Sequence, residues 1–316
     1  MADTDDSSAR WERNVLEKVA LSAVEEQRRA RRWGIFFKLL SFAWLFLLLF
    51  ALLGWMAKAE VSLPGKHSAM VELDGVIAPD SRASADLIVK GLRSAFEDSD
   101  TAGVILRINS PGGSAVQAAE INDAIRGLRK EHPNIPLYAV VDDECASGAY
   151  YVAVAADKIF VNKASLVGSI GVLIDGFGFT GAMHKLGIER RLLTAGVNKG
   201  FLDPFSPLTP QQRAYAEQML REVHEQFIAA VKEGRGARLK QSPELFSGLV
   251  WTGATSVGMG LADGFGSIDS VARDVIKAEH VVDFTPRESV TDRFARLIGA
   301  DTSAAMPPAG LELRAE

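Results

Sequence analysis

The chain has a single cysteine, Cys145, among its 316 residues, so it forms no internal disulfide bond and its fold must hold without one. An excess of positive charge is also missing. The formal net charge is −5, which gives no electrostatic reason to expect nucleic acid as a partner. No spacing of histidine, cysteine and carboxylate residues indicates a metal site. The sequence also shows no internal repeat and no low-complexity domain.

One long apolar run stands near the N-terminus. Nineteen uncharged residues, Leu39 to Ala57, lie between Lys38 and Lys58. As a helix they span roughly 28 Å, close to the thickness of a hydrocarbon core. The run predicts one transmembrane helix. A cleaved secretory signal with its cleavage site near Ala59 is the alternative, but the charged preamble of more than thirty residues and the length of the run argue against it.

The residues that flank the run predict its orientation. Arginines precede it at positions 28, 29, 31 and 32, whereas only Lys58 and Lys66 closely follow it. Because cytoplasmic flanks carry the excess of Lys and Arg, we expect residues 1–32 in the cytoplasm and residues 33–57 in the cytoplasmic membrane as a single-pass anchor. The bulk of the chain then lies on the outer, periplasmic or extracellular side. Trp33 and Trp55 stand where an interfacial aromatic belt is expected.

Beyond a linker at residues 58–67, strand-like apolar runs alternate with helix-like segments. This alternation predicts an α/β domain of βαβ units over residues 68–284. The expected strands are 69–77, 103–109, 137–141, 158–161, 170–174 and 190–194, and the expected helices are 85–96, 115–130, 148–156, 181–186 and 210–232. Residues 285–316 form a C-terminal extension, because periodicity fades there and its end, 302–316, is typical of a flexible tail.

Two short turns, each between an expected strand and an expected helix, contain the residues suited to chemistry. In the first, Asn109 to Ser114, paired glycines leave backbone N–H groups free to approach an anion. A tight turn without function explains paired glycines about as well, and the turn lacks the ending of a nucleotide-binding loop. In the second, Cys145 to Tyr150, small residues expose the Ser147 hydroxyl. A lone serine there is more often a helix N-cap, so a nucleophile requires a base.

The chain offers two candidate bases. Four of its histidines are expected at the surface: His67, His132, His224 and His280. His184 is the remaining one, although its apolar neighbours equally suggest a helix packed on the sheet. Lys199 stands in a polar turn between Gly196 and Gly200, and a lysine acts as a base only when its surroundings keep it neutral. An isolated loop lysine is usually solvated, but its occurrence together with both turns favours Lys199.

Four segments, in order, resemble the signal peptide peptidase A family of serine-lysine peptidases, of the S49 type and in its half-length form. They are RINSPGG (107–113), ASGAYY (146–151), VGSIGV (167–172) and the turn Asn198-Lys199-Gly200. The segment GLADGFG (260–266) is similar to a late turn of that family, and we interpret it as structural because its glycines fit a helix end. The resemblance implies the fold shared with Clp protease and the crotonases, a homo-oligomer, and no metal or organic cofactor.

Carried onto this sequence, the resemblance implies that Ser147 is the nucleophile and Lys199 the general base, which Ser169 orients. The N–H groups of Gly113 and Gly148 would bind the oxyanion. Implied partners are the membrane and peptide substrates, namely remnant signal peptides or other apolar unstructured segments. The resemblance leaves open whether serine and lysine meet within one chain or across a subunit boundary. Two alternatives remain: a crotonase-like enzyme acting on acyl thioesters, and an inactive membrane scaffold.

Overall fold

A computed structural model describes residues 21, 26–29, 31–51, 65–240, 242 and 244–286 in two units, Met1–Pro64 and Gly65–Glu316. In the first unit, the helix Glu26–Ala51 is long and apolar enough to cross a membrane, with a mean hydropathy of 2.2. By length and composition it is the one such helix among these residues. The predicted anchor, residues 33–57, is therefore helical as far as Ala51. Trp55, Ala59 and the C-terminal extension beyond residue 286 lie outside the described residues.

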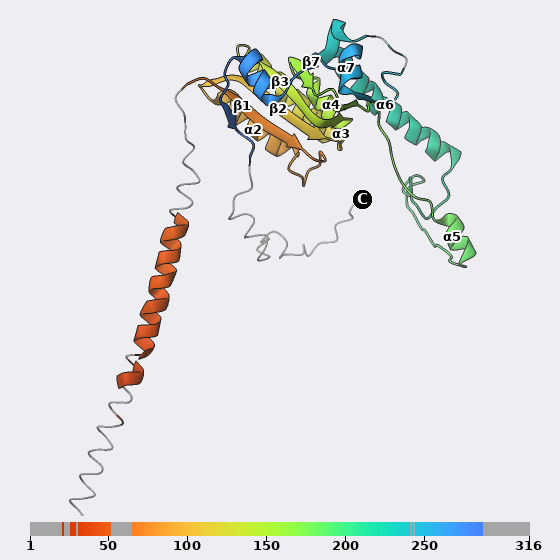
Figure 1. Ribbon diagram of the computed structural model, residues 1–316. Coiled ribbons are helices and arrows are strands. Elements are labelled where there is room, and N and C mark those ends of the chain that lie inside the picture. The colour runs from red at the N-terminus through yellow and green to blue at the C-terminus, as the bar shows by residue number, and fades with distance from the viewer. Residues whose placement is uncertain are drawn as a thin grey trace, which may run out of the picture. The chain divides into compact units, whose positions relative to one another are not determined.

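The second unit is built on one eight-stranded sheet (Figure 1). Its strands are β1 (His67–Asp74), β2 (Thr101–Ser110), β3 (Leu137–Ala146), β4 (Lys158–Val161), β5 (Leu166–Gly168), β6 (Val250–Thr252), β7 (Gly264–Phe265) and β8 (Val281–Asp283). The order is β6-β5-β3-β2-β1-β8, with β4 paired to β3 and β7 to β4. All pairs are parallel except β5 with β6. The predicted α/β class is confirmed.

Strand β3 pairs with two different strands along one of its edges. Its first half, Tyr138–Val141, pairs with β4, and its last three residues, Glu144–Ala146, pair with β5. On the other side, its end lies beside the end of β2, where Ser110 is opposite Cys145. The carboxyl ends of β2, β3 and β5 therefore meet at one edge, which is where open parallel sheets place their ligand sites.

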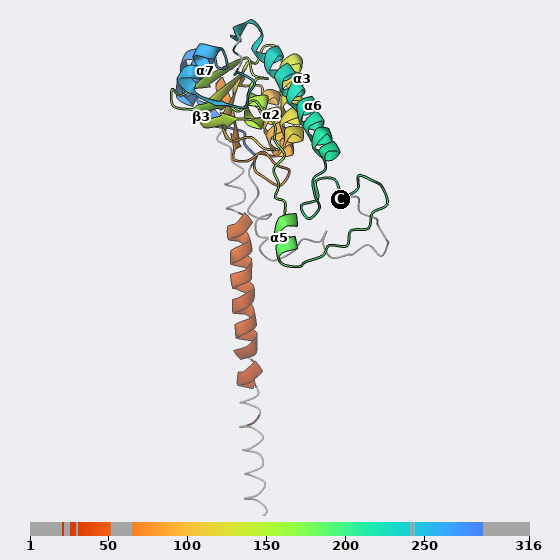
Figure 2. The same ribbon diagram turned by 90° about the vertical axis from the view of Figure 1, so that its right-hand side faces the viewer.

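Helices cover the two faces of this sheet unequally. They are α2 (Ala85–Glu97), α3 (Ala115–Glu131), α4 (Gly148–Ala153), α5 (Thr180–Lys185), α6 (Pro210–Arg235), η1 (Gly236–Arg238), α7 (Gly253–Met259), α8 (Ile268–Ser270) and the π-helix η2 (Val271–Ile276). Side chains alternate along β2, so Leu106 enters the main core with α2, α3, α4 and α6, while Ile105 faces the smaller cluster around Val271. Figure 2 shows α3 and α6 together on one side.

Two expected strands are wrong. Residues 170–174 and 190–194 contain no strand. The apolar runs predicted burial, but Leu173 is 80% exposed and Leu193 is 95% exposed. Both belong to the long excursion between β5 and α6 that carries α5 away from the sheet (Figure 1). An apolar run favours a buried strand only if a neighbouring strand is available to pair with it.

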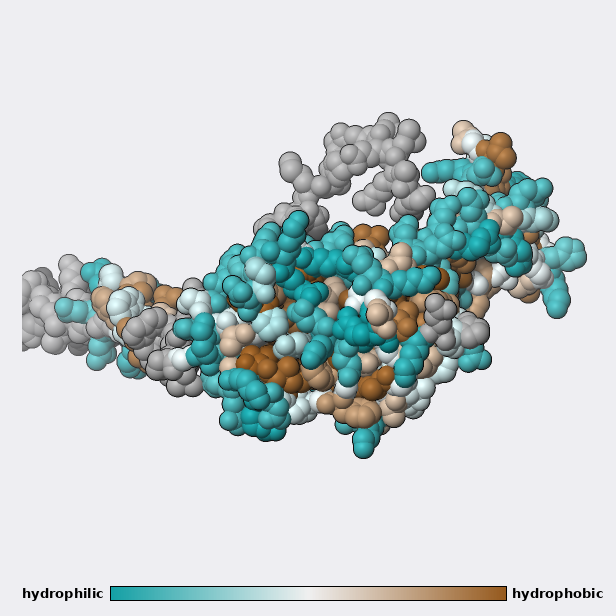
Figure 3. Space-filling view, turned by 90° about the horizontal axis from the view of Figure 1, so that it is seen from above, coloured by the Kyte–Doolittle hydropathy of each residue, from teal (hydrophilic) through white to brown (hydrophobic). Residues whose placement is uncertain are grey.

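Exposed apolar side chains gather on this excursion and on the first half of α6. They include Leu173, Phe177, Leu186, Leu193, Val197 and Tyr215. Figure 3 shows brown, apolar residues among polar ones at the right-hand end, where α5 and α6 lie in Figure 1. Apolar patches of this kind mark interaction surfaces.

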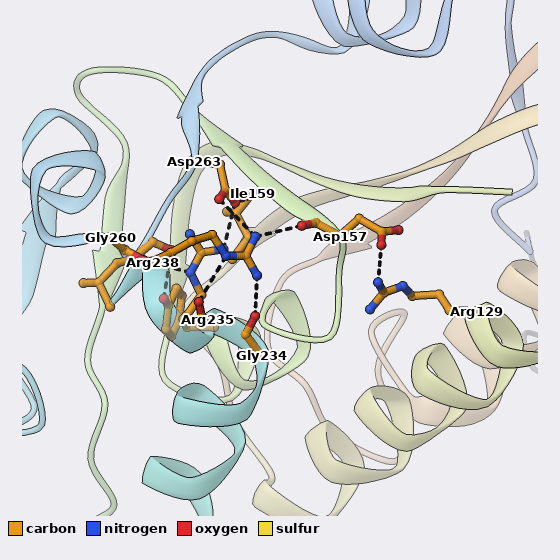
Figure 4. Close-up of polar contacts among 10 residues, drawn as sticks. Arg129, Asp157, Ile159, Gly234, Arg235, Arg238, Gly260 and Asp263 are labelled. Atoms are coloured by element: carbon orange, nitrogen blue, oxygen red, sulfur yellow. Dashed lines mark hydrogen bonds and ion pairs between the residues drawn. The ribbon is translucent and has the colours of Figure 1, made fainter. Parts of the chain in front are cut away.

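A polar network holds the C-terminal end of α6 (Figure 4). Arg235, only 1% exposed, forms an ion pair of 2.8 Å with Asp263 and donates to the Gly260 carbonyl at 2.8 Å. Arg238 also donates to Asp263, at 3.1 Å. One residue before Arg235, a Cβ on Gly234 would lie 2.1 Å from the Val154 carbonyl oxygen, so α6 packs directly on the end of α4. Gly260 caps α7 in the left-handed conformation, as expected for that turn.

Candidate active site

Ser147 occupies a strained turn between β3 and α4. Its φ is 52° and its ψ is −123°, a conformation that a side chain rarely adopts and that costs on the order of 1–3 kcal/mol. Two hydrogen bonds hold it there: its N–H donates to the Gly168 carbonyl at 2.9 Å, and its carbonyl accepts from the Tyr151 N–H at 3.0 Å. The Ser147 hydroxyl makes no capping hydrogen bond to α4. Ser147 therefore stands at the N-cap position of α4, but its hydroxyl does not cap the helix.

The paired glycines of the first turn lie against Ser147. A Cβ on Gly112 would lie 2.6 Å from the Gly148 nitrogen, and a Cβ on Gly113 would lie 2.2 Å from the Ile77 carbonyl oxygen. Both glycines also have positive φ, 96° and 145°, so no other residue fits this approach. Within the described part of the chain, neither the Gly113 N–H nor the Gly148 N–H donates a hydrogen bond. Two free amides thus lie beside Ser147 and line the same cavity.

A cavity of about 640 Å³ opens at this point. Ser147, Ser169, Gly113 and Gly148 all line it. Most of its remaining wall is apolar and includes Ala118, Tyr151, Leu173, Met219, Val223 and Phe227. A cavity of this size and polarity accommodates an apolar side chain of a ligand while leaving a few polar groups to orient it.

Ser169 is the second strained serine of the cavity. It follows β5 with a φ of 51°, and its N–H donates to the Leu249 carbonyl at 2.8 Å. One residue further, the Ile170 carbonyl lies 3.1 Å from Nε2 of His224 on α6. The backbone from Gly168 to Ile170 is therefore hydrogen-bonded at three consecutive residues.

Neither candidate base lies at Ser147 within one chain. Lys199 is exposed, lies in the excursion between β5 and α6, and is absent from the cavity wall. Its N–H donates to the Gly196 carbonyl at 3.2 Å in a local turn, and its neighbour Val197 is 99% exposed. His184 is likewise exposed, on α5. The fold of one chain thus brings together Ser147, Ser169, Gly113 and Gly148, but not Lys199.

Three of the four histidines expected at the surface are partly or fully buried: His67, His224 and also His132, whose ring lies 5.6 Å from that of Phe96. His67 is 7% exposed and stacks on Phe284. His224 is half-buried, because it lies on the inward stripe of α6 formed at helical spacing by Leu220, His224, Phe227 and Val231. That spacing was readable in the sequence and is the signal that identifies His224 as an inward residue.

Cys145 is fully buried. Burial and the charge of Glu144 raise the pKa of its thiol, so the nucleophilic thiolate is disfavoured and the residue is a packed one. Among the described residues, no group of three or more histidine, cysteine, aspartate or glutamate side chains is arranged to hold a metal ion.

Comparison with known families matches residues 129–282 to Peptidase family S49. A protein of Enterococcus faecium named as a putative signal peptide peptidase is 29% identical over 201 residues, which are 64% of this chain and 58% of that protein. A putative protease of Methanocaldococcus jannaschii is 30% identical over 208 residues, 66% of each chain.

A protein of Brucella abortus named as a Na⁺/H⁺ antiporter is 40% identical over 220 residues. The match covers 68% of this chain but only 29% of that protein. This chain therefore spans less than a third of the Brucella protein.

Proposed function

Because the chain belongs to peptidase family S49, we propose that it is a membrane-anchored serine endopeptidase that cleaves apolar, unstructured peptide segments such as remnant signal peptides. The observation that carries this proposal concerns Ser147, whose backbone is strained and whose hydroxyl makes no capping bond to α4. It lines an apolar cavity together with two free backbone amides. The helix Glu26–Ala51 supports the anchor.

The chemistry begins with attack of the Ser147 hydroxyl oxygen on the scissile carbonyl carbon. Its proton passes to the neutral amine of Lys199, and the carbonyl oxygen gains negative charge facing the N–H groups of Gly113 and Gly148. Preorganised donors of this kind each contribute about 2.7–4 kcal/mol to transition-state stabilisation. The intermediate then collapses with breakage of the C–N bond, and the leaving amine takes the proton from Lys199. Lys199 next deprotonates a water molecule that attacks the acyl-enzyme carbonyl, and it returns that proton to the Ser147 oxygen as the ester bond breaks.

Lys199 reaches the site in this proposal from a second copy of the chain. In its own chain it is exposed and outside the cavity, in an excursion rich in exposed apolar side chains. An exposed apolar surface of this kind supports association of subunits. Burial by the neighbouring subunit would then supply the apolar surroundings in which a lysine loses its proton. Ser169 shares the cavity with Ser147, and in this proposal it orients that lysine.

Covalent labelling tests the nucleophile directly. The full chain in detergent is treated with an alkyl fluorophosphonate, and the modified residue is located by mass spectrometry. We expect modification of Ser147, together with loss of turnover of an apolar fluorogenic peptide. A folded protein that hydrolyses the peptide without being labelled at Ser147 contradicts the proposal.

The same preparation separates the two other readings. An acyl-thioester enzyme would bind and turn over a coenzyme A ester, which a peptidase leaves untouched. A scaffold without activity would react with neither the fluorophosphonate nor the peptide. The paired glycine turns and the uncapped serine favour the peptidase, since a scaffold has no need of either.

A further inference from the structure

His224 makes the side-chain contact that restrains the backbone beside Ser169. Its Nε2 lies 3.1 Å from the Ile170 carbonyl oxygen. A carbonyl oxygen only accepts, so Nε2 carries the hydrogen and the histidine donates. Ile170 is fully buried and His224 is half-buried, so the bond is largely shielded from water.

The bond acts on a strained residue. Ser169 has a φ of 51°. A residue keeps such a strained conformation only when several contacts with the surrounding structure hold its backbone in place. Three hydrogen bonds do so here: Gly168 accepts from the Ser147 N–H, the Ser169 N–H donates to Leu249, and Ile170 accepts from His224. The first two join backbone to backbone. The third is the one that comes from a side chain and can be removed by substitution.

The same bond also fixes helix α6. The C-terminal end of α6 is held by Arg235 and by the close approach of Gly234 to Val154. His224 lies eleven positions before Arg235, which is about three helical turns. Phe227 lies on α6 between these two anchored residues and faces the cavity. His224 therefore joins the wall of the cavity to the Ser169 segment.

We propose that His224 is a positioning residue: by donating to the Ile170 carbonyl it keeps the Ser169 hydroxyl directed into the cavity that holds Ser147. This inference rests on the proposed peptidase function. Without the bond, Ser169 relaxes toward negative φ, its hydroxyl turns away, and the lysine that it orients is held less well. Substrate still binds, because the cavity wall and the Ser147 turn are unchanged.

The test compares His224→Leu, which cannot donate, with His224→Gln, whose amide nitrogen can reach the position of Nε2. His280→Leu is the matched control, since His280 is exposed and its side chain has no hydrogen-bond partner in the described part of the chain. For His224→Leu we expect kcat to fall about three- to tenfold, the size of one lost hydrogen bond, with KM unchanged. His224→Gln and His280→Leu should keep the parental kcat.

A double mutant shows whether His224 acts through Ser169. If it does, His224→Leu costs nothing further in a Ser169→Ala background, because residues that act as one unit are not additive. A purely structural role in the cavity wall predicts the opposite result. KM then rises in His224→Leu, the fall in kcat caused by His224→Leu persists in the Ser169→Ala background, and His224→Gln does not restore the parental kcat. Either a parental kcat in His224→Leu or full additivity overturns the inference.

Two further measurements prevent an ambiguous result. Should His224→Leu lose the parental size on gel filtration, His224→Glu replaces it, because Glu matches Gln in shape but does not donate when ionised; equal kcat in Glu and Gln variants overturns the inference. Ser147→Ala is measured alongside. If the parent protein shows no peptide turnover that is lost in Ser147→Ala, the proposed function and this inference are overturned together. If the parent is active but the His224 variants do not behave as expected, this inference alone is overturned.

Discussion

The N–H of Ser147 donates a hydrogen bond of 2.9 Å to the carbonyl of Gly168, the residue before Ser169. This bond continues the pairing of β3 with β5, in which Ala146 stands opposite Gly168. It links Ser147 to the residue that precedes Ser169, and both serines have positive φ, 52° at Ser147 and 51° at Ser169. The end of one strand pair thus holds both serines of the cavity that have positive φ.

Substitution of Ser147 should separate chemistry from strain. Ser147→Ala and Ser147→Gly both lack the nucleophilic hydroxyl, so both should lose turnover of an apolar peptide while keeping the parental oligomer size. Glycine also relieves the positive φ, which an alanine retains, by about 1 kcal/mol. Ser147→Gly should therefore melt about 2–4 °C above Ser147→Ala. Near-normal turnover in either variant would remove Ser147 from the mechanism.

Gly148→Ala should block the pair of free amides without unfolding the turn. The added Cβ would lie 3.3 Å from the Gly113 nitrogen and would meet no closer atom, and Gly148 does not have positive φ. Alanine also suits the first turn of a helix. We expect a folded protein whose kcat is lower by about 10²–10³, as for loss of one oxyanion donor. Circular dichroism provides the control, and a folded variant with full kcat would exclude this role for Gly148.

The general base should be Lys199 and not His184. Lys199→Arg should be almost inactive, because arginine keeps the charge but is not deprotonated in proteins. His184→Gln should retain most of the activity, since His184 is exposed and outside the cavity. Both variants are assayed as intact oligomers. An inactive His184→Gln beside an active Lys199→Arg would replace the serine-lysine mechanism with a serine-histidine one.

Asp263→Asn should strongly destabilise the domain. Arg235 is 1% exposed and pairs with Asp263 at 2.8 Å, so the substitution leaves a buried charge without its counter-charge. Breaking a buried pair in this way costs about 3–5 kcal/mol. Thermal melting followed by circular dichroism measures the loss, with the exposed Asp274→Asn as the matched control. Equal melting of the two variants would show that the Arg235 network does not stabilise the fold.

The same carboxylate should make stability depend on pH. Burial alone raises the pKa of Asp263, but hydrogen bonds from Arg235 and the Ile159 N–H, with the charges of Arg235 and Arg238, outweigh it and lower the pKa below its ordinary value. The folded state therefore binds this proton less readily than the unfolded chain does. The stability that the ionised Asp263 adds to the folded state is fully present above the unfolded pKa of about 3.9, and it is lost as pH falls through the lower folded pKa. Melting temperatures measured from pH 7 to pH 3 should therefore fall less steeply at the acid end in Asp263→Asn than in the parent protein.

The peptidase unit should lie outside the cytoplasmic membrane, because the arginines that precede the apolar run mark its cytoplasmic side. Added protease should digest residues 65–286 in intact spheroplasts, with a cytoplasmic protein as the control for intactness. Protection of this unit until lysis would reverse the topology.

The α/β class and most elements of the main core were predictable from the sequence. Residues 158–161 form β4 as expected, and α2 and α3 end within one residue of their predicted bounds. These segments bury one periodic apolar face against immediate neighbours in the chain, and that local pattern specifies their secondary structure. The two glycine turns were also identified, because strand, turn and helix follow one another without interruption.

Tertiary structure alone decided the rest. Residues 190–194 have no strand to pair with, which the local pattern does not reveal. His224 meets Ile170 across 54 positions of sequence. Sequence determined which residues have reactive groups, since chemistry belongs to the side chain. Which of those groups share one cavity depends on β3 pairing with β5 and on α6 packing against the main core. Helical spacing shows which face of α6 is inward, but no local pattern shows which element that face meets.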